Sequence, residues 1–165
     1  PCVMEGYFQD PDATASVLRD GFYATGDFGY LKGGELYLVG RIKELIILRG
    51  RNYPPHEFEE CALDTGRVDA GRVAAFGAAD TTIGSEKLVL VIEPDRYESL
   101  PALRLDIQQR LRSRFGFGAS EIRFVKKGAI PRTTSRKVRR LECLRLYGEG
   151  ALAFHAEEVE TTDQT

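Results

Sequence analysis

Apolar and polar residues follow two different periods along this chain, and the changes of period predict its helices and strands. Between residues 100 and 115, apolar side chains recur at steps of three and four, while arginines and a glutamine occupy another face. This pattern predicts an amphipathic helix, which Gly116 and Gly118 end. Short apolar runs predict strands at 72–77, 87–93 and 121–125, and further helices are expected from about residue 13 and over 56–63 and 139–147.

A β-hairpin is predicted upstream of these elements. Segments 28–31 and 35–39 flank Lys32-Gly33-Gly34, where glycines adopt positive φ in a turn at little cost. Residues 41–43 then link the hairpin to a strand over 44–48, and residues 49–52 are predicted as a turn. Strands and helices alternate irregularly, which favours an α+β fold: a small three-stranded sheet flanked by helices and preceded by the hairpin.

Composition narrows the class of protein. The 165 residues are 42% hydrophobic and 29% charged, which fits a soluble globular domain, and the net charge of −2 provides no general attraction to nucleic acid. No apolar run approaches the roughly 20 residues of a membrane span. The three cysteines lack metal or redox spacing and indicate reduced thiols and a cytoplasmic location. The abrupt start at Pro1, without a secretory signal, is expected of a fragment or an excised domain.

Three short polar segments carry the candidate chemistry. Lys137 follows a run of hydroxyl residues, Asp27 ends a Thr-Gly-Asp sequence, and Arg41 and Lys43 follow Gly40. An acid, an arginine and a lysine in such loops suit the sugar, phosphates and acyl group of an activated nucleotide. Each also has a simpler interpretation, as a turn aspartate, a solvated arginine between strands or a solvated lysine in a basic run.

These segments resemble the superfamily of acyl-CoA synthetases, nonribosomal-peptide adenylation domains and firefly luciferase, and above all the fatty acyl-AMP ligases. The resemblance rests on Gly-Glu-Leu-Tyr before Gly40 and on the motifs at 41–47, 49–54 and 130–133. It covers nearly the whole chain, but only the C-terminal third or so of such an enzyme. It implies that residues 1–40 end a large nucleotide-binding domain and that residues 41–165 form a mobile C-terminal domain.

The resemblance also implies roles for single residues. Asp27 would accept hydrogen bonds from both ribose hydroxyls of ATP, and Arg41 would contact the nucleotide near the domain boundary. Lys43 falls at the hinge, where backbone torsions absorb a rotation of the small domain. Lys137 matches the adenylation lysine, whose ammonium offsets the repulsion between a carboxylate and the α-phosphate.

One position departs from the family pattern. The family has glycine immediately before the lysine, and this chain has Arg136. Three outcomes are open: the loop has an ordinary conformation, Arg136 is strained, or this copy is impaired. Because the rest of the motif is intact, we expect the site to be competent.

The implied enzyme joins a fatty acid to ATP, with Mg²⁺, and gives acyl-adenylate and pyrophosphate. The acyl group then passes to the phosphopantetheine thiol of an acyl carrier protein or polyketide synthase. We expect the fragment to be inactive without the large domain, its partner in the same enzyme. Two alternatives stay open: the same domain of an acyl-CoA synthetase that uses CoA, or a noncatalytic module that docks a carrier protein through the basic segment 132–140.

Overall fold

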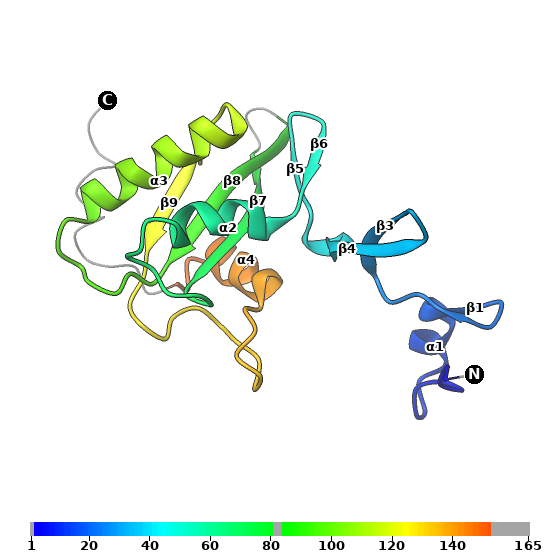
Figure 1. Cartoon of the computed structure of the whole chain (residues 1–165). Coiled ribbons are helices and arrows are strands. Elements are labelled where there is room, and N and C mark those ends of the chain that lie inside the picture. The colour runs from blue at the N-terminus through cyan, green and yellow to red at the C-terminus, as the bar shows by residue number, and fades with distance from the viewer. Residues whose placement is uncertain (1, 81–83, 153–165) are drawn as a thin grey trace. The chain divides into compact units, whose positions relative to one another are not determined.

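The computed structural model describes residues 2–80 and 84–152. The chain divides into two compact units, Pro1–Lys43 and Glu44–Thr165 (Figure 1). The first unit begins with the predicted helix α1 (Pro11–Val17), where the Asp10 carboxylate accepts a 2.9 Å hydrogen bond from the Ala13 amide. The predicted hairpin is confirmed as β3 (Asp27–Lys32) paired with β4 (Glu35–Arg41). A smaller hairpin, β1 (Leu18–Arg19) with β2 (Phe22–Tyr23), was not predicted.

A 3₁₀ turn, η1 (Ile42–Glu44), contains the boundary between the units, and a short hairpin follows it. Strand β5 (Ile46–Leu48) pairs with β6 (Arg51–Tyr53), so the prediction of a turn over 49–52 was wrong in its second half. Arg49 and Gly50 both have positive φ, 52° and 75°. Two such residues complete a tight hairpin turn, and the chain is therefore extended again by residue 51.

The predicted three-stranded sheet is confirmed and forms the centre of the second unit. Its order is β7 (Val73–Asp80), β8 (Ser85–Ile92), β9 (Glu121–Phe124), with the first pair antiparallel and the second parallel. Parallel neighbours need a crossover connection, which here contains helix α3 (Leu100–Phe115). This helix has the bounds predicted from its apolar period, and the Gly116 amide closes it with a 2.9 Å bond to the Arg112 carbonyl.

Both faces of this sheet are covered. Helices α2 (Pro55–Leu63) and α3 pack on one face, and α4 (Arg140–Gly148) packs on the other (Figure 1). Alternate residues of β7 enter the two cores: Val73 and Ala75 face α2 and α3, whereas Ala74 and Phe76 face α4. The α+β architecture follows from this arrangement. No helix in the described ranges is long and apolar enough to cross a membrane.

Candidate functional site

Lys137 lies on a small hydrogen-bonded hairpin of the second unit. Arg132 and Val138 form an isolated antiparallel bridge. The Thr133 amide donates to the Lys137 carbonyl at 2.9 Å, and the Lys137 amide donates to the Thr133 hydroxyl at 3.0 Å. The Lys137 side chain is exposed. The backbone of the lysine is therefore held by the fold, while its ammonium stays available to a group outside this unit.

A buried carboxylate anchors the first arm of this hairpin. Glu93, only 1% exposed, accepts a 2.7 Å bond from Arg132 and a 2.8 Å bond from the Ile130 amide. Arg132 also donates from Nε to the Gly71 carbonyl at 2.8 Å. A buried charge is stable only when it is paired and hydrogen-bonded, and both conditions hold here.

A second buried carboxylate anchors the chain just after Lys137. Arg140 binds Glu59 with two parallel bonds of 2.7 Å, and Glu59 also accepts a 3.1 Å bond from the Ala75 amide. The hydrogen bonds that Arg140 donates to Glu59 raise the pKa of the Arg140 guanidinium above its ordinary value. Arg140 donates as well to Glu44, at 3.0 Å. Because Glu44 directly follows Lys43, one arginine connects the segment after the predicted hinge to the base of the lysine hairpin.

These anchoring residues were not predicted from the sequence. A solvated basic run was the simpler interpretation of the residues around Lys137, but Arg132 and Arg140 are each bound to a buried carboxylate. Glu59, within the helix predicted over 56–63, is buried as well. One signal was available for Glu93, which directly follows the apolar run of β8 and therefore required a buried partner.

Arg136 is in the left-handed backbone region, with φ of 64°. Of the three outcomes left open by the sequence, this conformation corresponds to the strained arginine. Its amide donates to the Thr133 carbonyl at 2.9 Å, which helps to close the turn. The loop therefore keeps a backbone shape suited to glycine and places a cationic side chain on it.

Asp27 and Arg41 form an ion pair in the first unit. They are direct partners in the register of β3 and β4, and the Arg41 Nε lies 2.9 Å from the Asp27 Oδ1. Gly26 precedes the aspartate with φ of 76°, and its carbonyl accepts a 2.9 Å bond from the Ile42 amide. Only glycine adopts this φ readily, so the Thr-Gly-Asp sequence produces the turn that presents the carboxylate.

The four predicted site residues thus fall in two groups. Asp27 and Arg41 are brought together, and Lys43 follows them as an exposed residue of η1. Lys137 belongs to the other unit.

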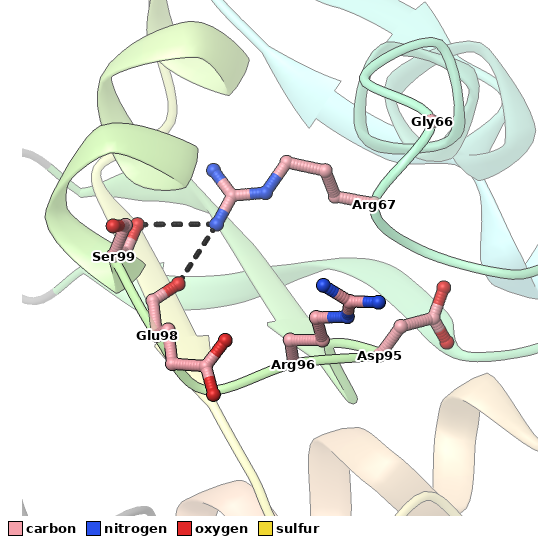
Figure 2. A pocket seen from close by; sticks show the side chains of 6 residues that line it. All are labelled: Gly66, Arg67, Asp95, Arg96, Glu98 and Ser99. Atoms are coloured by element: carbon pink, nitrogen blue, oxygen red, sulfur yellow. Dashed lines mark hydrogen bonds between the residues drawn. The ribbon is translucent and has the colours of Figure 1, made fainter.

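A hollow of about 590 Å³ lies elsewhere in the second unit and includes none of the predicted residues. Its lining, shown in Figure 2, has mixed charge: Gly66, Arg67, Asp95, Arg96, Glu98 and Ser99. The Arg67 guanidinium points across it and donates to the carbonyls of Glu98 and Ser99, at 3.0 and 3.3 Å. Arg67 therefore holds the start of α3 in place, which is a structural role.

Comparison with models of known protein families gives no match. Among curated sequences, the chain is 33% identical over 162 residues to the long-chain-fatty-acid–AMP ligase FadD23 of Mycobacterium tuberculosis, covering 88% of this chain and 27% of that protein. A protein of the same organism named as a fatty-acid–CoA ligase, fadD25, is 33% identical over 165 residues with the same coverage. The chain thus spans about a quarter of the length of these relatives.

Comparison with solved structures finds a similar fold in enzymes of the same kind. A structure from a study of fatty acyl-adenylate ligases of E. coli and L. pneumophila superposes with a TM-score of 0.79 at 36% identity, covering 91% of this chain and 26% of that one. The adenylation and carrier domains of McyG with phenylalanyl-adenylate superpose with a TM-score of 0.80 at 26% identity, covering 88% and 26%. Sequence and fold therefore agree on the same group of enzymes.

Proposed function

We propose that this chain, which belongs to the superfamily of adenylate-forming ligases, is the part of a fatty acyl-AMP ligase that brings a catalytic lysine to the nucleotide. The whole enzyme would use ATP. A fatty-acid carboxylate oxygen bonds to the α-phosphorus of ATP, and the bond to pyrophosphate breaks. The phosphopantetheine thiol of a carrier protein then attacks the acyl carbon, loses its proton and displaces AMP.

The anchored hairpin of Lys137 carries this proposal. Its lysine is exposed, while a buried ion pair fixes the chain on each side, through Glu93 and Glu59. A charge that stabilises a transition state must be positioned in advance, because reorganisation during the reaction reduces its effect. The ammonium would approach both the carboxylate and the α-phosphate. Loss of such a contact typically lowers the rate by about a hundredfold to a thousandfold.

The first unit supports a large domain as the partner within the same enzyme. None of residues 2–43 is buried, and its hairpins expose large apolar side chains such as Phe22, Leu31 and Leu38, which are 70–78% accessible. Two-stranded hairpins are rarely stable without a surface to cover. In the whole enzyme we assign that surface to the nucleotide-binding domain, with Asp27 and Arg41 at its edge.

The Asp27–Arg41 pair suits a ribose. Arg41 engages one carboxylate oxygen, and a carboxylate has acceptor sites for further hydroxyl donors. Mg²⁺ has no comparable support, because the described part of the chain brings together no group of three or more metal-binding side chains. We therefore assign no Mg²⁺ ligand to these residues.

A chimeric enzyme tests the proposal. The whole chain replaces the matching segment of a fatty-acid–AMP ligase, and the product formed from a long-chain fatty acid and ATP is identified by mass spectrometry. Acyl-adenylate formation by the chimera, and none by the 165-residue chain alone, is expected. Adenylate formation by the chain alone, or an inactive but folded chimera, would contradict it.

An acyl-CoA synthetase is the second candidate, because a relative at 33% identity is named as a fatty-acid–CoA ligase. The same chimera distinguishes the two acceptors when it is supplied with CoA and a phosphopantetheinylated carrier together. Acyl transfer to the carrier alone supports the AMP ligase. Transfer to CoA alone supports the synthetase.

A further inference from the structure

A second hollow lies beside the Lys137 hairpin. It has a volume of about 540 Å³, within the range of small-ligand sites. Its walls come from the turn at 69–72, Glu93 just after β8, the loop at 127–128 and the hairpin itself. The lining residues are Asp69, Ala70, Gly71, Arg72, Glu93, Lys127, Gly128, Arg132 and Arg136.

The charges of this hollow do not cancel. Arg132 is bound to Glu93, and Arg72 is bound to Asp69 and, outside the lining, to Asp95. Lys127 and Arg136 remain, and within the described ranges neither forms an ion pair. Two cations without acidic partners thus share a concave surface, where the field of each adds to that of the other.

The position of Arg136 gives the hollow a feature that a solvated basic loop lacks. Its backbone lies against Gly71, whose added Cβ would stand 3.8 Å from the Arg136 carbonyl oxygen. It holds a left-handed φ of 64°, which an arginine adopts at a cost that glycine avoids. Backbone strain of this kind gathers at functional sites, where a side chain is needed despite the strain.

We propose that this hollow binds an anion of the phosphate class, with Lys127 and Arg136 as its charged ligands. A guanidinium fork and an ammonium are the two groups that bind phosphate oxygens best in proteins. Two sources share this chemistry in the proposed reaction: the pyrophosphate that leaves ATP and the phosphate of the phosphopantetheine arm. The binding claim does not depend on the proposed function; only this choice of sources does.

Isothermal titration of the 165-residue chain with pyrophosphate, and separately with 4′-phosphopantetheine, tests the site. Saturable 1:1 binding of at least one ligand is expected, with affinity that falls as salt is added. Lys127→Ala and Arg136→Gly should each weaken binding by about tenfold or more, the usual effect of losing a charge-assisted hydrogen bond. Lys126→Ala removes the same charge one residue away, outside the lining, and should change the Kd less than about twofold.

The outcomes separate cleanly. Binding of pyrophosphate alone assigns the hollow to the leaving group, and binding of phosphopantetheine alone assigns it to the acceptor. Absence of saturable binding of both ligands would overturn the proposal, as would an equal loss in the Lys126 variant. Denaturant unfolding of each variant shows whether it is folded, and Arg136→Gly relieves strain rather than adding it. Because titration requires no catalysis, its failure leaves the adenylation proposal standing, and an inactive chimera leaves this one standing.

Discussion

Asp27 and Arg41 face each other across the β3–β4 hairpin, with 2.9 Å between the Asp27 Oδ1 and the Arg41 Nε. The pair is exposed: 33% of the aspartate side chain and 62% of the arginine side chain are accessible. Ion pairs of this kind contribute only about 0–1 kcal/mol to stability. The effect of the pair therefore lies in orientation, because the arginine fixes which way the carboxylate presents its remaining acceptor sites.

Replacing Asp27 should weaken the binding of ATP and leave the binding of the fatty acid unchanged. In the chimeric ligase, Asp27→Asn removes a charged acceptor for the ribose hydroxyls and should raise the KM for ATP by about tenfold. The KM for the fatty acid should not change. Steady-state kinetics with each substrate in turn measure both values, and Asp12→Asn, an exposed aspartate in α1, is the matched control. Equal changes in both KM values would argue against a ribose contact.

Glu59 should be far more important to stability than an exposed acid. Glu59→Gln leaves Arg140 with a weakened partner in a buried site, and breaking such a pair typically costs about 3–5 kcal/mol. We expect the free energy of unfolding, measured in urea, to fall by about 3 kcal/mol. Glu149→Gln removes the exposed partner of Arg145 in the same unit and should cost less than about 1 kcal/mol. Similar losses in the two variants would show that the buried pair is not an anchor.

At position 136 we predict that glycine is more stable than alanine, the reverse of their usual order of stability. At most positions alanine is more stable than glycine, by about 0.5–1 kcal/mol in a helix. At φ of 64° the order should invert, because alanine retains the strain of about 1–2 kcal/mol and glycine does not. Urea unfolding of Arg136→Gly and Arg136→Ala compares them directly, since both lack the guanidinium. An alanine variant as stable as the glycine variant would mean that the left-handed conformation is not held in solution.

The contribution of Glu121 to stability should depend on pH. Burial raises the pKa of its carboxyl, but hydrogen bonds from Lys87, Tyr147 and Arg123 outweigh this and leave the pKa below its ordinary value. A lowered pKa in the folded state stabilises the fold above the unfolded pKa, and that contribution is lost as the pH falls through the folded pKa. The difference in unfolding free energy between wild type and Glu121→Gln should therefore be largest near neutral pH and shrink below about pH 4.

Denaturant titrations at several pH values measure this difference. Glu98→Gln removes a carboxylate from an exposed position and is the control for charge alone. A difference in unfolding free energy between wild type and Glu121→Gln that stays constant from neutral to acid pH would contradict a lowered pKa of Glu121 in the folded state.

Much of the fold was predictable because its signals are local. The 16 residues of α3 carry a repeated apolar stripe, and the predicted and observed bounds agree. The hairpin of β1 and β2 was missed because strands of two residues have no period to detect. Strand β6 was missed because its three residues follow a tight turn and resemble a continuation of it.

The support of the candidate site was less predictable, since it depends on contacts between distant parts of the chain. Glu59 and Arg140 are 81 positions apart, and nothing near either residue in the sequence identifies the other. Asp27 and Arg41 were each recognised from a motif, but their pairing required the register of the hairpin, which includes a bulge between Phe28 and Gly29. Arg136 was recognised as a departure from glycine, and its φ showed that the loop does not have an ordinary conformation there.

Lys137 is proposed to stabilise the transition state of adenylate formation. Separate assays of the two half-reactions, with Lys137→Ala in the chimeric ligase, test this role most directly. Adenylation from fatty acid and ATP should fall by about a hundredfold to a thousandfold, because the ammonium acts where two anions meet. Transfer of the acyl group from preformed acyl-adenylate to the carrier should stay within about twofold of the unchanged enzyme, since no such repulsion arises in that step. An equal loss in both half-reactions, or full adenylation without the lysine, would contradict the account.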